Sequence, residues 1–232
     1  RYAYSRMLDP IVGVSFTGLF DFFVELFGVE WLAWMMEGRP AFTGEGTDYK
    51  SIEAGYLTHW RRWVEDEVAS YCTEHGLQAP NRTTTVQPAG TKSLLTGASS
   101  GWHPPKAQRF IRRITTGRED PVALAAMDMG FNVIPAQSAR DSEGNLLDDI
   151  HDVRAQEWLI EIPTEVPWAR KEGADQFDLA KLPVTAQYGL YMNVQRVYTD
   201  HNTSATLELR EEEIPALAQL IYDDIQNDGG YI

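Results

Sequence analysis

The chain has 232 residues, of which 43% are hydrophobic and 11% aromatic, so it can build a sizeable core and is not globally disordered. Its 34 acidic and 20 basic residues give a formal net charge of −14, which excludes a generally basic nucleic-acid coat and argues against an anionic membrane surface as a partner. The single cysteine excludes a disulfide framework and a cysteine-rich zinc module.

Two helices are predicted in the amino-terminal part of the chain. Residues 16–37 place apolar side chains near the 3.6-residue spacing of a helix, and residues 51–75 repeat that pattern up to Gly76. The most apolar stretch, residues 17–36, could span a bilayer by length, but it holds three carboxylates, so we interpret it as a buried amphipathic helix. The tryptophans of both helices are expected in the core: Trp31, Trp34, Trp60 and Trp63. Without a signal-peptide pattern, the predicted location is the reducing cytoplasm.

Extended and helical segments alternate along the rest of the chain. Strands are predicted at residues 83–87, 109–116, 131–135, 158–163 and 204–209, and helices at residues 120–129, 183–198 and 211–226. This alternation indicates an α/β fold in one domain over residues 1–232, with strands paired in parallel through helical crossovers. Ligands of such sheets bind at the carboxyl ends of strands, so the loop after residue 87 is the first place to look for a site.

A basic segment interrupts this acidic chain. From His75 through Arg118 there is no aspartate or glutamate in 44 residues. Two interpretations are open: a solvated basic face that balances the acids elsewhere, or a binding site for a small polyanion. The lysines and arginines of the segment are Arg82, Lys92, Lys106, Arg109, Arg112, Arg113 and Arg118.

A glycine-rich loop lies inside this segment, from Gln87 to Gly101. Glycines let backbone N–H groups line a concavity, Thr91 and Ser93 add hydroxyl donors, and Lys92 adds charge. A helix beginning near Thr91 would further favour a phosphate. The spacing is neither that of a P-loop nor that of a dinucleotide fingerprint, and a plain turn without a ligand is the alternative.

Other candidates carry weaker signals. The five histidines have no i, i+4 spacing, so no metal site is predicted, and Cys72 is expected to be a buried structural thiol. The acids at residues 211–213 open a helix, where they complement its dipole. Residues 201–204 could cap the preceding helix or reach a site.

Residues 84–105 resemble the Pro-x-Gly-Thr-x-Ser…Ser-x-Gly segment of ribonucleotide reductases, and look most like the adenosylcobalamin-dependent, class II branch of the ribonucleoside-triphosphate reductase type. Residues 12–18 resemble that branch's Gly-Val/Ile-Ser-x-Thr-Gly helix entry, and residues 109–114 and 202–206 are also similar to it. The resemblance covers most of the chain.

The resemblance implies the carboxy-terminal half of a ten-stranded α/β barrel, hence a partial domain. It implies reduction of ribonucleotides, with triphosphates as the expected substrates, to deoxyribonucleotides for DNA replication by a radical mechanism. Adenosylcobalamin is the implied cofactor, and a dithiol such as thioredoxin the implied reductant; nucleic acid and membrane are not expected partners. Carried over by position, the substrate-phosphate site is Pro88, Ala89, Gly90, Thr91, Lys92 and Ser93.

The chain also departs from the family. The thiyl-forming cysteine in its Asn-x-Cys-x-Glu setting, the general-base glutamate and the reducing cysteine pair have no counterpart, and Cys72 matches none of them. We therefore assign no catalytic residue and no cobalamin contact here, expect these groups in an amino-terminal half upstream of Arg1, and expect the chain alone to be inactive. The alternatives are a split-gene subunit that needs such a partner, or a non-catalytic nucleotide-binding module that kept the loop.

Overall fold

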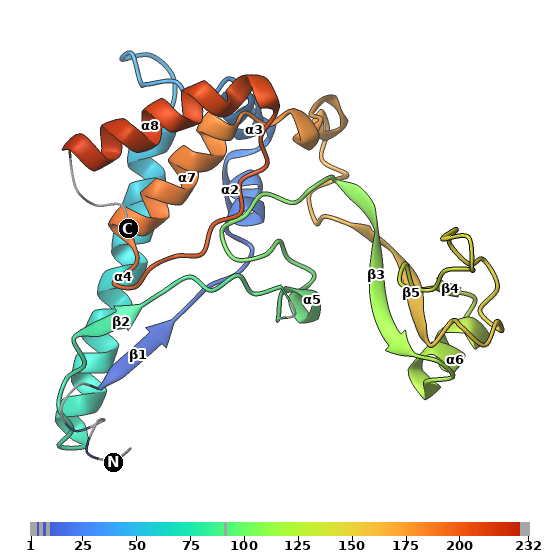
Figure 1. Ribbon diagram of the computed structural model, residues 1–232. Coiled ribbons are helices and arrows are strands. Elements are labelled where there is room, and N and C mark those ends of the chain that lie inside the picture. The colour runs from blue at the N-terminus through green and yellow to red at the C-terminus, as the bar shows by residue number, and fades with distance from the viewer. Residues whose placement is uncertain (1–3, 5–6, 8–9, 91, 228–232) are drawn as a thin grey trace. The chain divides into compact units, whose positions relative to one another are not determined.

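The computed structural model describes residues 4, 7, 10–90 and 92–227. The chain divides into two compact units (Figure 1). Unit 1 comprises Arg1–Ala107 and Val166–Ile232, and unit 2 comprises Gln108–Glu165. The prediction of one partial domain over residues 1–232 stays a prediction, and each unit is described by itself.

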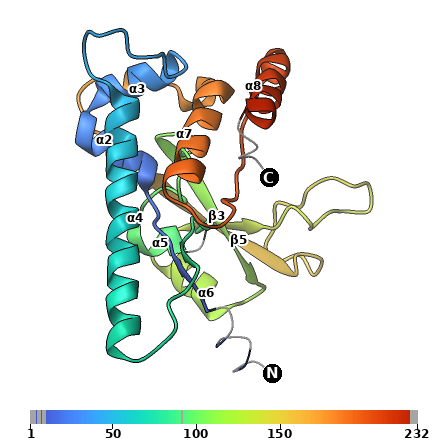
Figure 2. The same cartoon turned by 90° about the vertical axis from the view of Figure 1, so that its left-hand side faces the viewer.

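Unit 1 is mainly helical. Its helices are α2 (Leu19–Phe27), α3 (Val29–Met36), α4 (Tyr49–Glu74), the short α5 (Lys92–Thr96), α7 (Val184–Val197) and α8 (Ile214–Asn227). Three 3-10 turns accompany them: η1 (Ala174–Gln176), η2 (Leu179–Lys181) and η3 (Glu211–Glu213). Figure 2 shows α7 alongside the upper part of α4, against which it packs. The helices predicted at residues 51–75, 183–198 and 211–226 are confirmed, the last with η3 as its opening turn.

The single helix predicted over residues 16–37 is wrong, because two helices occupy this stretch. Gly28 separates them with φ 80°, a conformation that a residue with a Cβ rarely adopts. The break lets α3 fold back on α2, so that the rings of Phe20 and Trp31 meet edge-on at 4.9 Å. Both rings are fully buried in the core of unit 1.

The long helix α4 is less buried than its apolar pattern suggests. Its buried residues are Glu53, Leu57 and Cys72, which confirms the buried thiol. Trp63 is 69% exposed, so its predicted place in the core is wrong. Helical spacing identifies one face of a helix, but only packing against another element removes that face from water.

Two short strands of unit 1 pair in parallel. They are β1 (Ile11–Val14), which was not predicted, and β2 (Arg82–Thr84). Ile11 lies opposite Arg82 and Val14 opposite Thr84, with α2, α3 and α4 in the connection between the strands. Parallel pairing through a helical crossover is confirmed for this pair.

Unit 2 contains β3 (Arg109–Gly117), α6 (Pro121–Asp128), β4 (Asn132–Pro135) and β5 (Glu157–Glu165). The strand order is β3-β5-β4, and both pairings are antiparallel, so the prediction of parallel pairing is wrong here. The helical crossover from β3 to β4 does give the two strands the same direction, but β5 inserts between them and runs opposite to both. One face packs on α6 through Ala123, Trp158 and Ile160.

The strand predicted at residues 204–209 is also wrong, because this segment forms no regular element. Side chains take the place of a neighbouring strand. The Trp102 indole donates to the Ser204 carbonyl at 2.9 Å, and Gln187 both donates to the carbonyl and accepts from the amide of Glu208. Backbone groups satisfied in this way need no sheet.

Candidate phosphate-binding loop

The glycine-rich loop follows β2 in the chain, as predicted, although β2 ends at Thr84 and not at residue 87. Residues 85–90 form no helix or strand, and the first residue of α5 is Lys92. A helical turn therefore starts where the sequence suggested one, although Thr91 itself lies outside the described residues. The loop holds its shape by a bond from the Ser93 amide to the Ala89 carbonyl at 2.9 Å.

The residues of the predicted site differ in what they offer a ligand. Pro88, Gly90 and Lys92 are exposed, whereas Ala89 and Ser93 are buried. Ser93 uses both its amide and its hydroxyl within the loop, the latter on the Gly90 carbonyl at 3.1 Å. Ser93 thus shapes the loop, while its exposed neighbours face solvent.

Two amides of the loop have no acceptor in the described part of the chain, one on the buried Ala89 and one on the exposed Gly90. Apart from Gly90 itself and its two chain neighbours, no described residue has an atom within 4 Å of the position that a Cβ on Gly90 would take, so its surroundings are open. The Lys92 ammonium donates to the neutral Gln87 side chain at 3.1 Å, so this bond brings no opposing charge to it. Two N–H donors and one cation can neutralise part of an oxyanion's charge.

The far end of the loop is anchored to the start of α2. The Gly18 amide donates to the Ser99 carbonyl at 2.8 Å, and the Leu19 amide donates to the Gly101 carbonyl at 3.1 Å. Thr17 adds a hydroxyl that donates to the Ser99 carbonyl at 2.8 Å and accepts from the Gly101 amide at 3.0 Å. The segment 12–18 and the loop, far apart in the sequence, therefore form one structural piece.

Asp21 completes this anchor. Its buried carboxylate accepts from the Ser99 amide at 2.6 Å and from the Trp168 indole at 2.8 Å. In the sequence analysis Asp21 counted only as one of the three carboxylates in residues 17–36 that argue against a membrane span. Its role could have been inferred from its position on the apolar face of α2, because a carboxylate buried there needs hydrogen-bond donors.

Two positions at the anchor require glycine, because their φ angles are positive and a Cβ there would collide with a neighbouring atom. Gly101 has φ 57°, and a Cβ there would lie 2.7 Å from the Gln87 carbonyl oxygen. Gly18 has φ 79°, and its Cβ would lie 2.9 Å from that of Ala98. No real Cβ tolerates such distances from its neighbours, so these positions explain why glycine recurs in the segment.

His103 ties the loop to residues 204–206. Its Nδ1 bonds to the Ser100 carbonyl at 3.0 Å, and its Nε2 lies 3.1 Å from the Thr206 amide. Because Nε2 accepts from an N–H group, the proton of the neutral ring sits on Nδ1. Burial lowers the pKa of His103, and the bond to the Ser100 carbonyl opposes that effect only partly. His103 therefore holds the chain together as a neutral side chain.

Residues 201–204, which the sequence offered either as a cap or as part of a site, contact the last turns of α7. The Gln195 side chain donates to the His201 carbonyl at 3.3 Å and accepts from the Thr203 amide at 2.8 Å. The acid at the start of the last helix also acts structurally: Glu213 accepts from the Arg210 amide at 2.8 Å and from the Val184 amide at 3.0 Å.

Several cations of the basic segment pair with acids within their own unit. On β3, Arg109 pairs with Glu165 at 2.8 Å and Arg113 with Glu161 at 2.7 Å, both across the strand pair of unit 2. In unit 1, Lys106 pairs with Glu208 at 3.2 Å. Acids outside the segment thus balance several of its cations, and Lys92 is the one that lies in the loop.

Neither a metal centre nor a membrane helix is found in the part of the chain that the structure describes. No group of three or more histidine, cysteine, aspartate or glutamate side chains in residues 10–90 and 92–227 is placed to hold a metal ion. In the same residues, no helix combines the length and apolar character that crossing a membrane needs.

The fold is that of part of a class II ribonucleotide reductase. A solved B12-dependent (class II) ribonucleotide reductase superposes with a TM-score of 0.70 at 19% identity, covering 96% of this chain and 29% of that one. This likeness establishes the mixed α/β fold.

The sequence is similar to the same class. The adenosylcobalamin-dependent ribonucleoside-triphosphate reductase of Lactobacillus gasseri is 23% identical over 220 residues, 91% of this chain and 26% of that protein. A probable enzyme of this kind from Dictyostelium discoideum is 40% identical over 53 residues, 23% of this chain and 7% of that protein. No family model matches the chain. The chain is a distant homologue of adenosylcobalamin-dependent ribonucleotide reductases and spans about a quarter of the length of the relative from L. gasseri.

Proposed function

We propose that this chain is the carboxy-terminal half of the catalytic barrel of an adenosylcobalamin-dependent ribonucleotide reductase. In the whole enzyme, which would reduce ribonucleoside triphosphates, the loop from Pro88 to Ser93 holds the substrate phosphates. The observation that carries the proposal is the open loop itself, with unbonded amides at Ala89 and Gly90 and the Lys92 charge beside them, in a chain homologous to these enzymes.

The loop acts by positioning. Phosphate oxygens accept from the two amides, Lys92 offsets their charge, and the Thr91 hydroxyl is a further donor. With the phosphates fixed, the ribose 3′-hydrogen is aimed at the radical that the whole enzyme generates. The buried anchor at Asp21 supports this role, because donors that are held in place before the ligand arrives need no reorganisation when it binds.

The radical chemistry belongs to other parts of the enzyme. Adenosylcobalamin, when bound, supplies the radical in this class. Cys72 is 7% exposed on α4 and has no second cysteine to pair with. Because the sequence lacks the family's cysteine motifs, we assign no cofactor contact, radical cysteine, general base or thioredoxin contact to this chain.

The binding test uses a charge placed on the loop. Gly90→Asp adds a carboxylate where the surroundings are open, so the fold should tolerate it, while it repels a phosphate. We expect ribonucleoside-triphosphate binding, measured by calorimetry, to weaken by about 1–3 kcal/mol. Gly55→Asp is the matched control, since Gly55 is an exposed α4 residue with no atom within 4 Å of its Cβ position. Unchanged affinity in Gly90→Asp would remove the loop from the site.

The activity test separates the fragment from an enzyme complete in itself. A ribonucleoside triphosphate, adenosylcobalamin and a dithiol are incubated with the chain, alone and with the amino-terminal remainder of a class II relative. We expect deoxynucleotide only in the second mixture. Product from the chain unaided would contradict the proposal, and nucleotide binding without product in either mixture would favour the non-catalytic module.

A further inference from the structure

Ser100 closes the phosphate loop on itself. Its hydroxyl donates to the carbonyl of Pro88, where the predicted site begins, 12 positions earlier in the chain. The backbones of the two segments also lie against each other, since a Cβ on Gly101 would be 2.7 Å from the Gln87 carbonyl oxygen and 3.7 Å from that of Pro88. Ser100 falls on the variable position of the Ser-x-Gly pattern, so the family resemblance assigns it no role.

The Pro88 carbonyl and the Ala89 N–H belong to one peptide plane. No described peptide bond is cis, and in a trans peptide the C=O and N–H bonds point in opposite directions. A hydroxyl that fixes the Pro88 carbonyl therefore also fixes the direction of the Ala89 N–H, which has no acceptor among the described residues. Because Ala89 is only 9% exposed, its N–H can reach a ligand only if this plane is correctly turned.

Ser93 holds the next two carbonyls of the loop in the same way. Its amide donates to the Ala89 carbonyl at 2.9 Å, and its hydroxyl donates to the Gly90 carbonyl at 3.1 Å. Ala89 has φ 52°, a conformation that a residue with a Cβ rarely adopts, so the bonds around it keep the loop in a shape that it would not hold alone. Successive N–H groups in such a turn line a concavity that suits an anion.

The backbone that carries Ser100 is itself held in place. The amides of the residues before and after it donate to the Asp21 carboxylate at 2.6 Å and to the Thr17 hydroxyl at 3.0 Å. Its own carbonyl accepts from His103 Nδ1 at 3.0 Å. The anchor at the start of α2 thus reaches the Pro88 carbonyl through one hydroxyl group.

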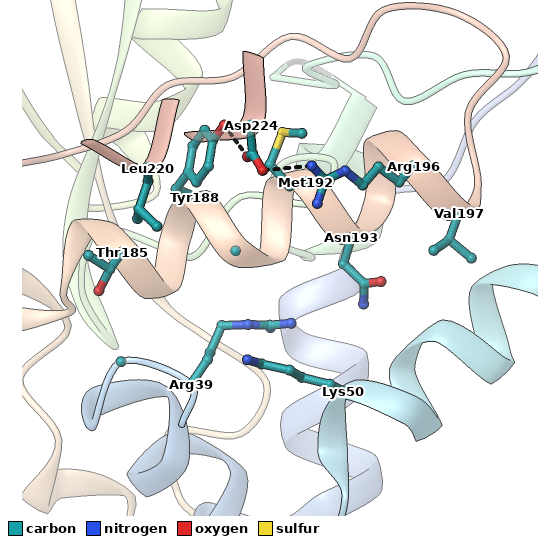
Figure 3. Close-up of a pocket in the computed structure, with 12 residues that line it drawn as sticks. Arg39, Lys50, Thr185, Tyr188, Met192, Asn193, Arg196, Val197, Leu220 and Asp224 are labelled. Carbon is teal, nitrogen blue, oxygen red and sulfur yellow. Dashed lines mark hydrogen bonds and ion pairs between the residues drawn. The ribbon is translucent and has the colours of Figure 1, made fainter. Parts of the chain in front are cut away.

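Two arginines at a separate cavity of unit 1 are already neutralised by carboxylates. Figure 3 shows this cavity, of about 400 Å³, with Arg196 bonded to Asp224 at 2.7 Å. Arg39, in the same view, pairs with Glu53 at 2.8 Å. No residue of the phosphate loop lines this cavity, and Lys92 in the loop bonds instead to a neutral side chain. The loop therefore keeps a positive charge next to the carbonyls that the serines hold.

We propose that Ser100 is a positioning residue of the phosphate loop: by holding the Pro88 carbonyl, its hydroxyl aims the Ala89 N–H before the nucleotide binds. This inference rests on the proposed function, because it concerns how that loop meets its ligand. Ser100 acts through the backbone and does not itself touch the phosphates. Without the hydroxyl, the Pro88 carbonyl bonds to water, the peptide plane can turn, and binding must first order it.

Three variants of Ser100 grade the strength of this hydrogen bond. Ser100→Thr keeps the hydroxyl, Ser100→Cys replaces it with a weaker donor, and Ser100→Ala removes it. For ribonucleoside-triphosphate binding to the full chain, measured by calorimetry, we expect Ser100→Thr to match wild type and Ser100→Ala to bind about fivefold more weakly, the effect of one hydrogen bond, with Ser100→Cys between them. Inorganic tripolyphosphate should show the same ratios, because the loop meets the phosphates alone.

Ser138→Ala is the matched control. It also removes a bonded serine hydroxyl, which donates to Glu157 at 3.2 Å, but in unit 2, so nucleotide affinity should not change. Urea unfolding shows which variants fold. If Ser100→Ala does not fold, the comparison of Ser100→Thr with Ser100→Cys still decides, since equal affinity of these two would overturn the role of the hydroxyl.

Three other results would also overturn this role: wild-type affinity in Ser100→Ala, equal losses in Ser100→Ala and Ser100→Thr, or a loss for the nucleotide that tripolyphosphate does not share. Gly90→Asp separates such a failure from a failure of the proposed function. If Gly90→Asp weakens the nucleotide while Ser100→Ala does not, the loop is still the site and only the role of Ser100 is wrong. If Gly90→Asp has no effect, both proposals are wrong.

Discussion

Glu53 is the acceptor at which three segments of unit 1 meet, and its removal is the sharpest test of how this unit is held together. Its fully buried carboxylate on α4 accepts from the Trp31 indole on α3 at 2.7 Å and from the Asn193 amide on α7 at 3.1 Å. The Arg39 guanidinium adds two bonds, at 3.2 and 2.8 Å. Four donor atoms thus converge on one anion.

Glu53→Gln preserves the shape of the side chain but not its chemistry. The charge that compensates Arg39 is lost, and one oxygen becomes an NH2 group that faces other donors. Removing one partner of a buried ion pair costs about 3–5 kcal/mol, and hydrogen bonds to charged groups contribute about 1.5–3 kcal/mol each. We expect the free energy of unfolding to fall by at least about 3 kcal/mol, a large part of the usual 5–15 kcal/mol.

Urea unfolding followed by helical circular dichroism measures this loss, because most helices belong to unit 1. Glu65→Gln is the control: Glu65 pairs with Arg61 at i, i+4 on the same helix but is 43% exposed, so about 0.3–0.5 kcal/mol is expected. A loss below about 1 kcal/mol in Glu53→Gln would refute the view that Arg39 depends on this carboxylate.

Three further predictions concern the anchor at Asp21, His103 next to the loop, and Tyr198, whose hydroxyl donates to the Val14 carbonyl of β1 at 3.1 Å. Asp21→Asn should cost about 1–3 kcal/mol and speed hydrogen exchange at the Ser99 amide, with no change in the amides of β3. Because burial holds the pKa of His103 below its usual value, the unfolded chain binds more protons below about pH 6.5, so stability should fall as the pH drops through that range, and His103→Gln should flatten the dependence. Burial raises the pKa of Tyr198 to about 12, so ultraviolet titration should show a late phenol transition that Tyr198→Phe removes. The stabilisation from the neutral Tyr198 should be lost as the pH rises above about 10.

Local sequence patterns predicted where individual helices and strands lie better than they predicted which elements pack or pair with one another. The helix at residues 51–75 and the strand at residues 109–116 match α4 and β3 within two residues at either end, because periodicity and capping are local properties. The order β3-β5-β4 is not local, since the return of the chain through residues 136–156 decides that β5 pairs between the other two. The exposure of Trp63 has the same cause. The sequence defines which residues share a helix face, but other elements must pack on that face to bury it.

The candidate loop was accessible from the sequence because its glycines, its position after a strand and its lysine lie within a few residues of one another. Its anchor was not. Asp21 contacts Ser99 across 78 positions and Trp168 across 147, and nothing in the spacing of these residues links them. The role of a buried acid is defined by its donors, which only the folded chain brings together.

Charge composition located the cations of the acid-free segment but could not say what neutralises them. Arg109 and Arg113 pair with acids that follow them by 56 and 48 positions, because an antiparallel strand returns the chain to the same place. These arginines hold a sheet of unit 2 and do not need a ligand. Lys92 bonds to a neutral amide, so its charge is still unbalanced where the free amides of Ala89 and Gly90 lie. Of the cations in this segment, Lys92 is the one in the loop, so the proposed phosphate site rests on that charge and on two backbone dipoles. Such an arrangement suits a phosphate whose position matters more than the strength with which it is held.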